Sequence, residues 1–428
     1  MHFDDEIIYD LVGVGVGPFN LGLACLTQPL TELKTIFFEQ KDGFDWHSGI
    51  MPEWSTLQIP FIADLVSFAD PVSRFSFLNY LKQKGNLYQF YIRENFYILR
   101  SEYNQYCKWA ADQLNNLRFG SRIDSISLDD YSGCYRVSGV NRNNHRFAVL
   151  ARNLVLGTGT TPVVPDFCLD FVGKVKLGAN YIHHKEECQK TRSITVVGSG
   201  QSGAEIYYDL LMDADKYGYQ LNWITQSDRF FSMDLGKLTL EFTSPDYTDH
   251  FFSLSPEKRD QIIESQGVLY KGINLSLVNN IYDLLYIKSQ KDNFKTRLLP
   301  STRLESVHRS GDGLELQLRQ VNSQKTFSLN TDTMILALGY RYQLPDFVSG
   351  ILPLLNRDQK GQLQLHRNYS VNNKQNVFVQ NVGLHSHGIS VNDLGMGCYR
   401  NSIIINKIVG RDVYGVESRI AFQEFAVA

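Results

Sequence analysis

Two stretches of the chain share one pattern of apolar and polar positions. Residues 7–16 (IIYDLVGVGV) are almost continuously apolar, and residues 18–26 (PFNLGLACL) follow with helical spacing. Residues 193–212 (SITVVGSGQSGAEIYYDLLM) repeat the order of apolar run, glycine-rich turn and helix. A further apolar strand follows each unit, at residues 35–39 and 219–226. Runs of this kind are typical of buried parallel strands, so the pattern predicts two βαβ units in an α/β fold.

The first glycine-rich turn has the form expected of a dinucleotide site. It reads Gly13-x-Gly15-x-Gly17-Pro18, with the proline in the first turn of the helix, where its missing N–H is not needed. Glycines let the backbone approach a pyrophosphate, which the helix N-terminus attracts. Glu39 ends the next strand and is placed to accept hydrogen bonds from a ribose 2′-OH. A tight turn without a ligand is the alternative.

The second turn matches the full dinucleotide fingerprint. It reads Gly198-x-Gly200-x-x-Gly203. The strand at 219–226 ends without an acid, which favours NADPH over NADH because an acid would repel a 2′-phosphate. Arg229 is the nearest base that could reach that phosphate, or it is an ordinary loop arginine.

Two similar segments bracket this second unit. Residues 154–165 and 334–345 are apolar strands that run into small residues and then a proline. We therefore expect the chain to leave one domain, build another and return, with residues 376–409 completing the first site. Residues 238–290 carry apolar positions at helical spacing, which predicts a small helical substrate domain on the second nucleotide-binding domain. The expected division is 1–165 (FAD domain, first part), 166–242 (NADPH domain, first part), 243–290 (substrate-binding helices), 291–336 (NADPH domain, second part) and 337–428 (FAD domain, second part).

Composition narrows the partners. The 428 residues carry a net charge of −3, which leaves no cationic excess for nucleic acid. No run of 18 apolar residues predicts a membrane span, and the acidic N-terminus is unlike a signal peptide. Six scattered cysteines without a C-x-x-C pair exclude a dithiol redox centre and favour the cytoplasm. The pair His183-His184, near Cys188, lacks a further ligand, so we expect a loop there and no metal.

Several segments together resemble the siderophore N-hydroxylating monooxygenases, which act on lysine, ornithine and related amines. The resemblance runs in order from about residue 8 to residue 410. The segments that carry it are 10–23 (DLVGVGVGPFNLGL), Trp46-His47, 56–71 (TLQIPFIADLVSFADP), 75–85 (FSFLNYLKQKG), 198–205 (GSGQSGAE) and His387-Gly388.

The resemblance implies an FAD-dependent class B monooxygenase with two Rossmann-like domains and a small, mostly helical substrate domain. NADPH would reduce FAD, and the reduced flavin would capture O₂ as a C4a-hydroperoxide. The lone pair of a neutral primary amine would then attack the distal oxygen, giving a hydroxylamine for hydroxamate siderophores. The protein would exclude water, hold the amine close and disfavour its charged form.

The resemblance also assigns roles by position. Asn274, in GINLSLV, is similar to the family asparagine between substrate and nicotinamide, and Gln58 accompanies it as a catalytic candidate. His387 would lie near the flavin, or be structural. The flavin pattern is matched by Gly13, Gly15, Gly17, Pro18, Glu39, Trp46, His47 and Gln58, and the NADPH turn by Gly198, Gly200, Gln201, Ser202 and Gly203.

One departure from the family bears on the substrate. Amino-acid-hydroxylating members carry F-L-K-D-L, whose lysine grips the substrate carboxylate; here the segment is 61–65 (FIADL), with Ala63 in place of that lysine. A carboxylate buried without a cation costs about 3–5 kcal/mol, or a hundred- to several-thousand-fold in affinity. A decarboxylated amine avoids this cost. Alternatively, Ala63 faces elsewhere and Lys82 or Lys237 grips a carboxylate.

We therefore expect a short diamine, with putrescine ahead of cadaverine. A protonated second amine would need an acceptor, for which Asp64, Glu241, Asp246 and Asp393 are candidates. Lysine, ornithine or histamine hydroxylation is the alternative within the enzyme class. An amine-independent NADPH oxidase or electron transferase is a second class, and a nucleotide-binding regulator is a third. Family members are often oligomers, so a homodimer or homotetramer is possible.

Overall fold

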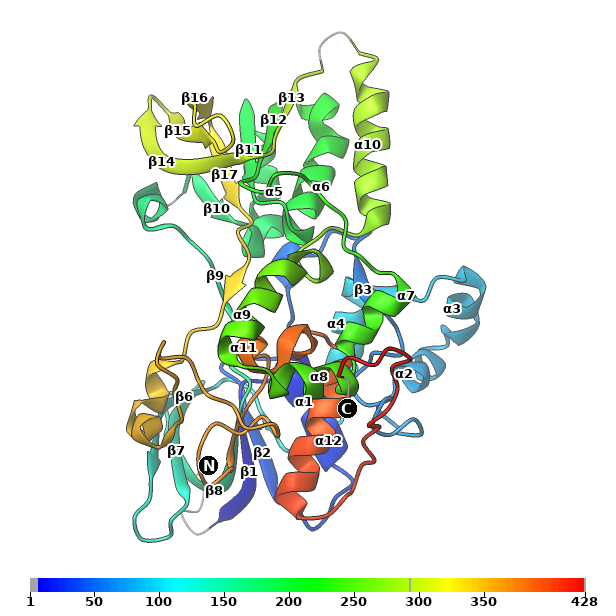
Figure 1. Cartoon of the computed structure of the whole chain (residues 1–428), viewed down its shortest axis with the longest axis vertical. Coiled ribbons are helices and arrows are strands. Elements are labelled where there is room, and N and C mark those ends of the chain that lie inside the picture. Colours follow the sequence, from blue (N-terminus) through cyan, green and yellow to red (C-terminus); the bar gives the residue numbers. More distant parts are fainter. Residues whose placement is uncertain (1–6, 172, 292–293, 427–428) are drawn as a thin grey trace.

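The computed structural model describes residues 7–171, 173–291 and 294–426, so the outermost residues of the expected first and last domain parts lie outside it. It is a mixed α/β structure with two lobes, each built on a largely parallel sheet (Figure 1). The first lobe contains a seven-stranded sheet in the order β5-β2-β1-β8-β7-β6, with β19 paired to β8. The second contains a five-stranded sheet in the order β10-β17-β11-β12-β13.

The first sheet is centred on β1 (Ile8–Val14). It lies parallel to β2 (Thr35–Phe38) on one side and to β8 (Arg146–Leu156) on the other. The short strand β19 (Val377–Val379) adds to β8, so the C-terminal part of the chain returns to the first sheet. The strands β5 (Leu117–Arg118), β6 (Ser121–Leu128) and β7 (Tyr135–Asn141) complete it.

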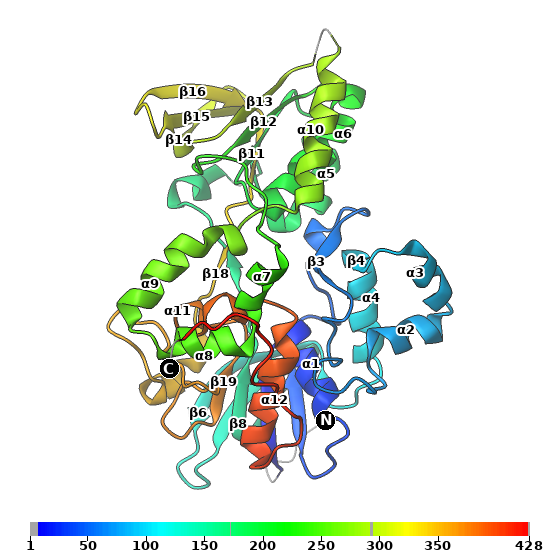
Figure 2. The same ribbon diagram turned by 45° about the vertical axis from the view of Figure 1, so that its right-hand side comes forward.

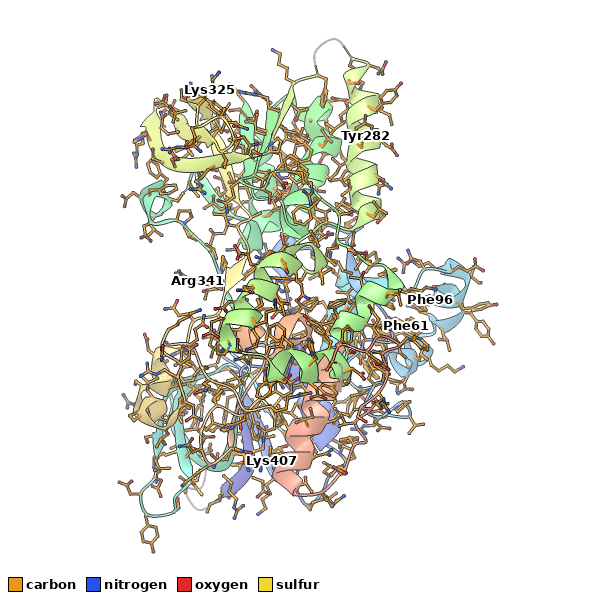
Figure 3. The ribbon with its side chains drawn as sticks, in the orientation of Figure 1. Phe61, Phe96, Tyr282, Lys325, Arg341 and Lys407 are labelled. Atoms are coloured by element: carbon orange, nitrogen blue, oxygen red, sulfur yellow. The ribbon has the colours of Figure 1, made fainter. Side chains whose placement is uncertain are left out.

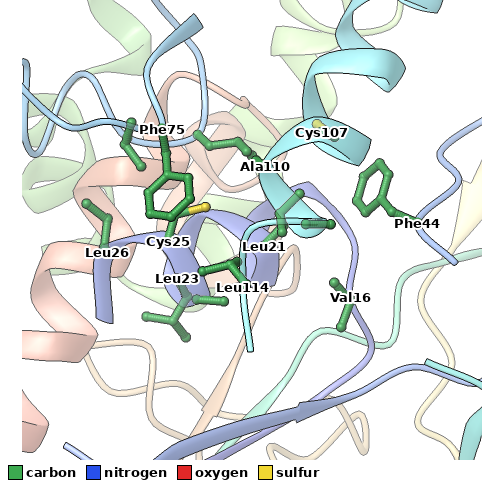
Figure 4. Close-up of a cluster of buried hydrophobic side chains, with 14 of the residues drawn as sticks. Val16, Leu21, Leu23, Cys25, Leu26, Phe44, Phe75, Cys107, Ala110 and Leu114 are labelled. Atoms are coloured by element: carbon green, nitrogen blue, oxygen red, sulfur yellow. The ribbon is translucent and has the colours of Figure 1, made fainter. Parts of the chain in front are cut away.

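Helix α1 (Pro18–Thr27) is buried nearly all round, as its apolar sequence predicts. It packs against α4 (Arg100–Ala111) and α12 (Met396–Val409), and its core includes Leu21, Leu23 and Cys25 (Figure 4). The first lobe also contains β3 (Thr56–Pro60), β4 (Tyr97–Leu99), α2 (Phe77–Lys84) and α3 (Leu87–Arg93), with Phe61 and Phe96 facing each other at its edge (Figure 3).

The second sheet follows the same logic. β11 (Ser193–Val197) leads into the long helix α6 (Gln201–Tyr217), and β12 (Gln220–Ile224) pairs with β11 in parallel. The strands β10 (Val175–Leu177), β13 (Thr296–Leu299) and β17 (Thr333–Leu336) complete it. A separate antiparallel sheet, not anticipated from the sequence, consists of β14 (Thr302–Ser310), β15 (Gly313–Gln320) and β16 (Thr326–Thr331).

Two passages of the chain join the lobes. β9 (Thr161–Pro162) leaves the first lobe and β18 (Tyr340–Arg341) returns to it, and the two pair antiparallel. These are the two proline-ended segments noted in the sequence, and they meet midway between the sheets (Figures 1 and 2).

The helical segment after residue 237 does not sit on the second lobe as one unit. α10 (Leu275–Ser289) packs against α6, but α8 (Pro245–Ser253) and α9 (Pro256–Ser265) contact α11 (Leu384–His387), which belongs to the C-terminal part. The segment therefore bridges the lobes, a correction to the expected placement. The same segment also contains α7 (Lys237–Leu240) and η4 (Glu241–Thr243) before α8, and η5 (Gln266–Leu269) after α9.

The His183-His184 pair lies in helix α5 (Tyr181–Gln189), and not in the loop expected from the sequence. His184 Nδ1 lies 3.4 Å from a carboxylate oxygen of Glu187, one turn ahead. Among the described residues, no three His, Cys, Asp or Glu side chains group as a metal site would require. None of the helices in the described ranges is both long and apolar enough to cross a bilayer.

Candidate functional site

The first glycine-rich turn has the geometry that a pyrophosphate requires. Gly15 adopts φ +85°, and a Cβ there would lie 2.4 Å from the carbonyl oxygen of Gly157. At Gly17 the place of a Cβ is open, with no atom within 4 Å. Gly17 is the N-cap of α1 and no side chain caps that helix, so its first N–H groups are available to an anion.

Polar groups around this turn have capacity to spare. The Nδ2 of Asn20 donates to the Gly15 carbonyl at 2.8 Å, while its buried Oδ1 has no partner. The buried hydroxyl of Thr158, after the end of β8, has the Tyr342 hydroxyl as its neighbour. Glu39 accepts hydrogen bonds from the N–H groups of Val16 and Lys41, at 2.8 and 2.9 Å. The residues present therefore fit a dinucleotide at the end of β1.

The second turn repeats these features at α6. Gly198 has φ +123°, and a Cβ there would lie 2.1 Å from the Ala337 carbonyl oxygen. Gly203 is as tightly placed, because its Cβ would meet the Gly198 carbonyl at 2.2 Å. Gly200 is the N-cap of α6 without a side-chain cap, and a Cβ there would make only an ordinary contact, at 3.7 Å. Ser202 lies in the first turn of the helix.

The residues beyond β12 are arranged around an exposed loop. Thr225 is buried, and its hydroxyl donates to Ser199 Oγ in the second turn at 2.8 Å. Arg229 is exposed and pairs with the neighbouring Asp228 at 2.9 Å. A surface pair of this kind is weak, so Arg229 is available to a phosphate group, although no contact ties it to the second turn.

Three amide side chains from distant parts of the sequence meet beside the second turn, at the start of α6. Gln58 Nε2, from β3, donates to Asn274 Oδ1 at 3.0 Å and lies 3.3 Å from Gln201 Oε1. The backbone N–H of Asn274 donates to that same Gln201 oxygen at 2.9 Å. Gln58 also contacts Met233 Sδ at 3.3 Å. The cluster connects the first lobe, the start of α6 and the start of α10.

A buried ion pair continues this cluster. Gln201 Nε2 donates to Glu205 at 2.7 Å, and the other Glu205 oxygen accepts from Arg100 at 2.7 Å. Their side chains are 1% and 12% exposed, so the pair is shielded from water. Burial raises the pKa of Glu205, and Arg100 opposes that rise. Arg100, on α4, thereby joins the first lobe to α6.

Trp46 and His47 lie on the loop after β2. The rings pack edge to face at 4.6 Å, and His47 faces Tyr340 of β18 at 6.0 Å. His47 adopts φ 55° and is solvent-exposed. The surrounding protein, followed by the charges of Arg100 and Lys41, nevertheless lowers its pKa to about 4. An accessible ring crowded by protein is typical of a side chain that lines a recess, and this one stays neutral at ordinary pH.

His387 is placed differently from His47. It is fully buried and stacks on Tyr369 at 4.3 Å. Its Nε2 donates to the Arg367 carbonyl oxygen, and its Nδ1 lies 2.9 Å from Ser386 Oγ. Burial lowers its pKa to about 3. Both ring nitrogens are thus occupied within the protein, which favours a structural role over contact with a cofactor.

Ala63 is buried in the loop after β3, 5% exposed. Its Cβ lies 3.6 Å from the point where a Cβ on Gly395 would stand, so it faces the turn that carries Asp393. Lys82 is exposed on the last turn of α2 and Lys237 is exposed at the start of α7. Ala63 therefore faces the protein interior, beside a carboxylate.

Several parts of this site carried no signal in the sequence. Arg100, Met233, Glu205 and Tyr340 were not among the candidates, although all four contact candidates. Glu205 stands one turn after Gln201 on a helix, which is the only local hint. Their partners lie far along the chain, so only the fold reveals them.

The chain is similar to known proteins over most of its length. A family model described as L-lysine 6-monooxygenase/L-ornithine 5-monooxygenase matches residues 7–342. A putrescine N-hydroxylase of Acinetobacter baumannii is 59% identical over 423 residues, which span 99% of this chain and 95% of the relative. A putrescine N-hydroxylase of Shewanella oneidensis is 49% identical, spanning 99% of this chain and 85% of the relative.

A solved structure is similar over the whole chain. It is the FAD-bound cadaverine monooxygenase of the desferrioxamine biosynthetic pathway of Erwinia amylovora, with a TM-score of 0.97 and 49% identity. The similarity covers 99% of both chains. The two lobes and their relation therefore have a close counterpart in a flavin-bound enzyme.

Proposed function

The chain belongs to the L-lysine 6-monooxygenase/L-ornithine 5-monooxygenase family, and from this premise we propose that it N-hydroxylates one primary amine of a short diamine. Putrescine is the preferred substrate and cadaverine the next. The enzyme is an FAD-dependent N-hydroxylating monooxygenase that uses NADPH and O₂. The observation that carries the choice of substrate is Ala63, which is buried where relatives that act on amino acids carry a cation.

Two sets of residues would hold the cofactors. The open N-terminus of α1 at Gly17, with Glu39 beyond β2, suits the pyrophosphate and ribose of FAD. The uncapped N-terminus of α6 at Gly200 suits the pyrophosphate of NADPH, and the exposed Arg229 is the base that could reach its 2′-phosphate. When bound and reduced, FAD supplies the activated oxygen that is transferred to nitrogen.

The chain's own residues position the substrate amine. The amide cluster of Gln58, Gln201 and Asn274 joins β3 of the first lobe to the second turn and offers both donors and acceptors there. An amide can accept a hydrogen bond from an N–H of a neutral amine without adding a charge, so the cluster orients nitrogen and leaves its lone pair free. The buried Arg100–Glu205 pair fixes Gln201, and the lobes with it.

The test is hydroxylamine formation with a panel of amines. We expect putrescine to give the highest kcat/KM, cadaverine the next, and ornithine, lysine and histamine much lower values. Ornithine should be at least about a hundredfold worse, because its carboxylate would enter a buried site without a cation. Comparable efficiency with ornithine would remove the significance of Ala63. NADPH oxidation at one rate with and without every amine, and without hydroxylamine, would instead identify an oxidase.

We also propose a place and a state for the enzyme. A hydroxylated diamine is a building block for hydroxamate siderophores. Its synthesis consumes NADPH as the reductant, which suits the cytoplasm. Self-association into a homodimer or homotetramer is supported by the exposed apolar side chains around α3, namely Tyr88, Tyr91, Ile92 and Phe96. Light scattering during size-exclusion chromatography tests this. A monomer at micromolar concentration would contradict it.

A further inference from the structure

A diamine that is neutral at one end and protonated at the other needs an anionic acceptor, and the structure separates the four candidate carboxylates. Asp64 is buried, and both of its oxygens are occupied. Oδ1 accepts from the N–H groups of Val66 and Ser67, and Oδ2 accepts from Ser67 Oγ and the Phe77 N–H, all within 2.9 Å. Asp64 therefore shapes its own loop.

Glu241 and Asp246 are occupied by the C-terminal segment. Glu241 accepts from the N–H groups of Phe422 and Gln423, at 2.9 and 3.1 Å. Asp246 accepts from those of Ile420 and Ala421, at 3.0 and 3.4 Å. These two carboxylates hold the end of the chain, Glu241 through both oxygens and Asp246 through Oδ2 alone. Within the described part of the chain, no hydrogen bond or ion pair connects either of them to Ala63, and so we set them aside in favour of Asp393.

Asp393 is the remaining candidate, and its carboxylate has capacity to spare. Its Oδ1 accepts from the Gly395 N–H at 2.6 Å, and the Met396 N–H also lies alongside. Within the described residues it forms no ion pair, and two N–H donors leave lone pairs of the carboxylate unused. The charge of Arg400 opposes the rise in its pKa from a distance. Two nitrogens of that guanidinium bond to Gln380 and the Val391 carbonyl, and its buried Nη2 has no partner.

The position of Asp393 places it beside the flavin site. The adjoining Leu394 lines a small cavity with Pro18 and Phe19, at the start of α1, and with Leu65. A Cβ on Gly395 would lie 2.9 Å from Asp393 Oδ1 and 3.6 Å from the Ala63 Cβ. The carboxylate and the alanine that replaces the family lysine therefore belong to one small region.

We propose that Asp393 accepts the distal ammonium of the diamine and so selects molecules with a second positive charge. The proposal rests on the proposed function. Asp393 is half-buried and crowded by protein, which raises its pKa, so a cation at the unused lone pairs of its carboxylate gains a shielded ion pair and keeps the carboxylate ionised. Ala63 brings no charge to this region, whereas a lysine in its place would bring an ammonium towards the same carboxylate.

The test compares two amines of equal chain length in the holoenzyme. Putrescine carries a distal ammonium and 1-aminobutane does not. In Asp393→Asn we expect KM for putrescine to rise about ten- to a hundredfold, the loss of one charge-assisted hydrogen bond, while KM for 1-aminobutane changes little. The asparagine oxygen still accepts from Gly395, so the turn is retained. Asp412→Asn, an exposed acid beyond the other end of α12, is the matched control and should leave both KM values unchanged.

Two further variants keep the proposal falsifiable. Ala63→Lys should abolish the preference for putrescine, because its ammonium would occupy Asp393. If Asp393→Asn does not fold, Asp393→Ser keeps an acceptor for the Gly395 N–H and takes its place. An unchanged putrescine KM in a folded Asp393 variant would overturn this inference and leave the proposed function standing. A wild-type enzyme that hydroxylates no diamine would overturn the proposed function itself.

Discussion

Gly17 and Gly200 occupy equivalent positions in the two turns, and both could carry a methyl group without a clash within the protein. Gly17→Ala should therefore fold, but its Cβ would stand where FAD pyrophosphate approaches the helix. We expect FAD affinity to fall at least about tenfold, with Tm of the apoprotein unchanged. Gly200→Ala should do the same to NADPH affinity alone. Fluorescence titration of each variant measures both.

Gly43→Ala is the matched control for this pair. Gly43 also has no atom within 4 Å of a Cβ, but it lies in an exposed loop. It should change neither affinity. Equal loss of FAD in Gly43→Ala and Gly17→Ala would show that the effect is not one of approach to the phosphate.

His387 provides a pH signature of the fold. Burial lowers its pKa from an ordinary 6.5 to about 3, so between these values the unfolded chain binds a proton that the folded chain does not. The free energy of unfolding therefore falls as pH decreases from about 6.5 towards 3, with this residue contributing about 1.4 kcal/mol per pH unit. In His387→Gln, whose Nε2 can still donate to the Arg367 carbonyl, that contribution should vanish. Urea unfolding at pH 7 and pH 5 measures it.

His145, which is exposed, supplies the control. His145→Gln should keep the slope of the wild type. Identical slopes in the wild type and in His387→Gln would mean that His387 is charged in the folded protein.

At the residue scale, the role of the turn glycines could be predicted from the sequence, but the partners of the side chains could not. The turn at Gly15 depends on a local backbone conformation, which the sequence encodes directly. Gln58 and Asn274 lie 216 residues apart, and their contact exists only because the lobes meet. The sequence indicated both residues by resemblance, and the fold supplied the hydrogen bond between them.

At the element scale, continuous apolar runs were sufficient for the buried strands. β1, β2, β11 and β12 all lie within the segments predicted for them, α1 begins at the expected Pro18, and α6 begins within the predicted unit 193–212. Exposed elements were harder to predict from the sequence. α5 carries the polar stretch around His183-His184, whose apolar face is weak. In the half-exposed sheet β14–β16, β15 does alternate Leu314, Leu316 and Leu318 with polar residues, a period-2 signal in the sequence that our prediction did not use. The partner of α8 and α9 lies near residue 384, which periodicity cannot reveal.

The C-terminal segment acts as a strap across the helices that bridge the lobes. Phe425 packs against Phe242 at 5.3 Å and Tyr247 at 5.0 Å. Phe425→Ala should destabilise this contact by about 1–3 kcal/mol, because two aromatic pairs and their buried area are lost. We expect faster proteolysis within 237–253 and less hydroxylamine per NADPH consumed.

The same segment provides its own control. Phe422 is 93% exposed, so its side chain contributes little packing to this segment. Phe422→Ala should leave the proteolysis rate and the yield of hydroxylamine unchanged. If both variants behave like the wild type, the strap does not hold α7 and α8 in place.

At the scale of the whole molecule, the lobes are held by three kinds of contact: paired connecting strands, bridging helices and the polar network from Asn274 to Arg100. The order of the chain through the lobes could be expected from its two proline-ended segments. The network could not, because its members are single polar residues on separate elements. Because it links β3 and α4 of the first lobe to the start of α6, we infer that it holds the second turn in place against the first lobe.

Removing one partner of the Arg100–Glu205 pair tests that role. Arg100→Met leaves a carboxylate buried without its cation, which costs about 3–5 kcal/mol and raises the pKa of Glu205 further. Because the folded pKa is then raised, the variant should lose stability as pH rises above the ordinary value of a glutamate. The double variant Arg100→Met/Glu205→Gln should recover much of the lost stability. Urea unfolding of the wild type, Arg100→Met, Glu205→Gln and the double variant gives the coupling energy between the two side chains. Arg192→Met, which breaks an exposed pair with Asp332, should change stability by less than about 1 kcal/mol. Additive effects of the two Arg100–Glu205 substitutions would show that the ion pair does not join the lobes.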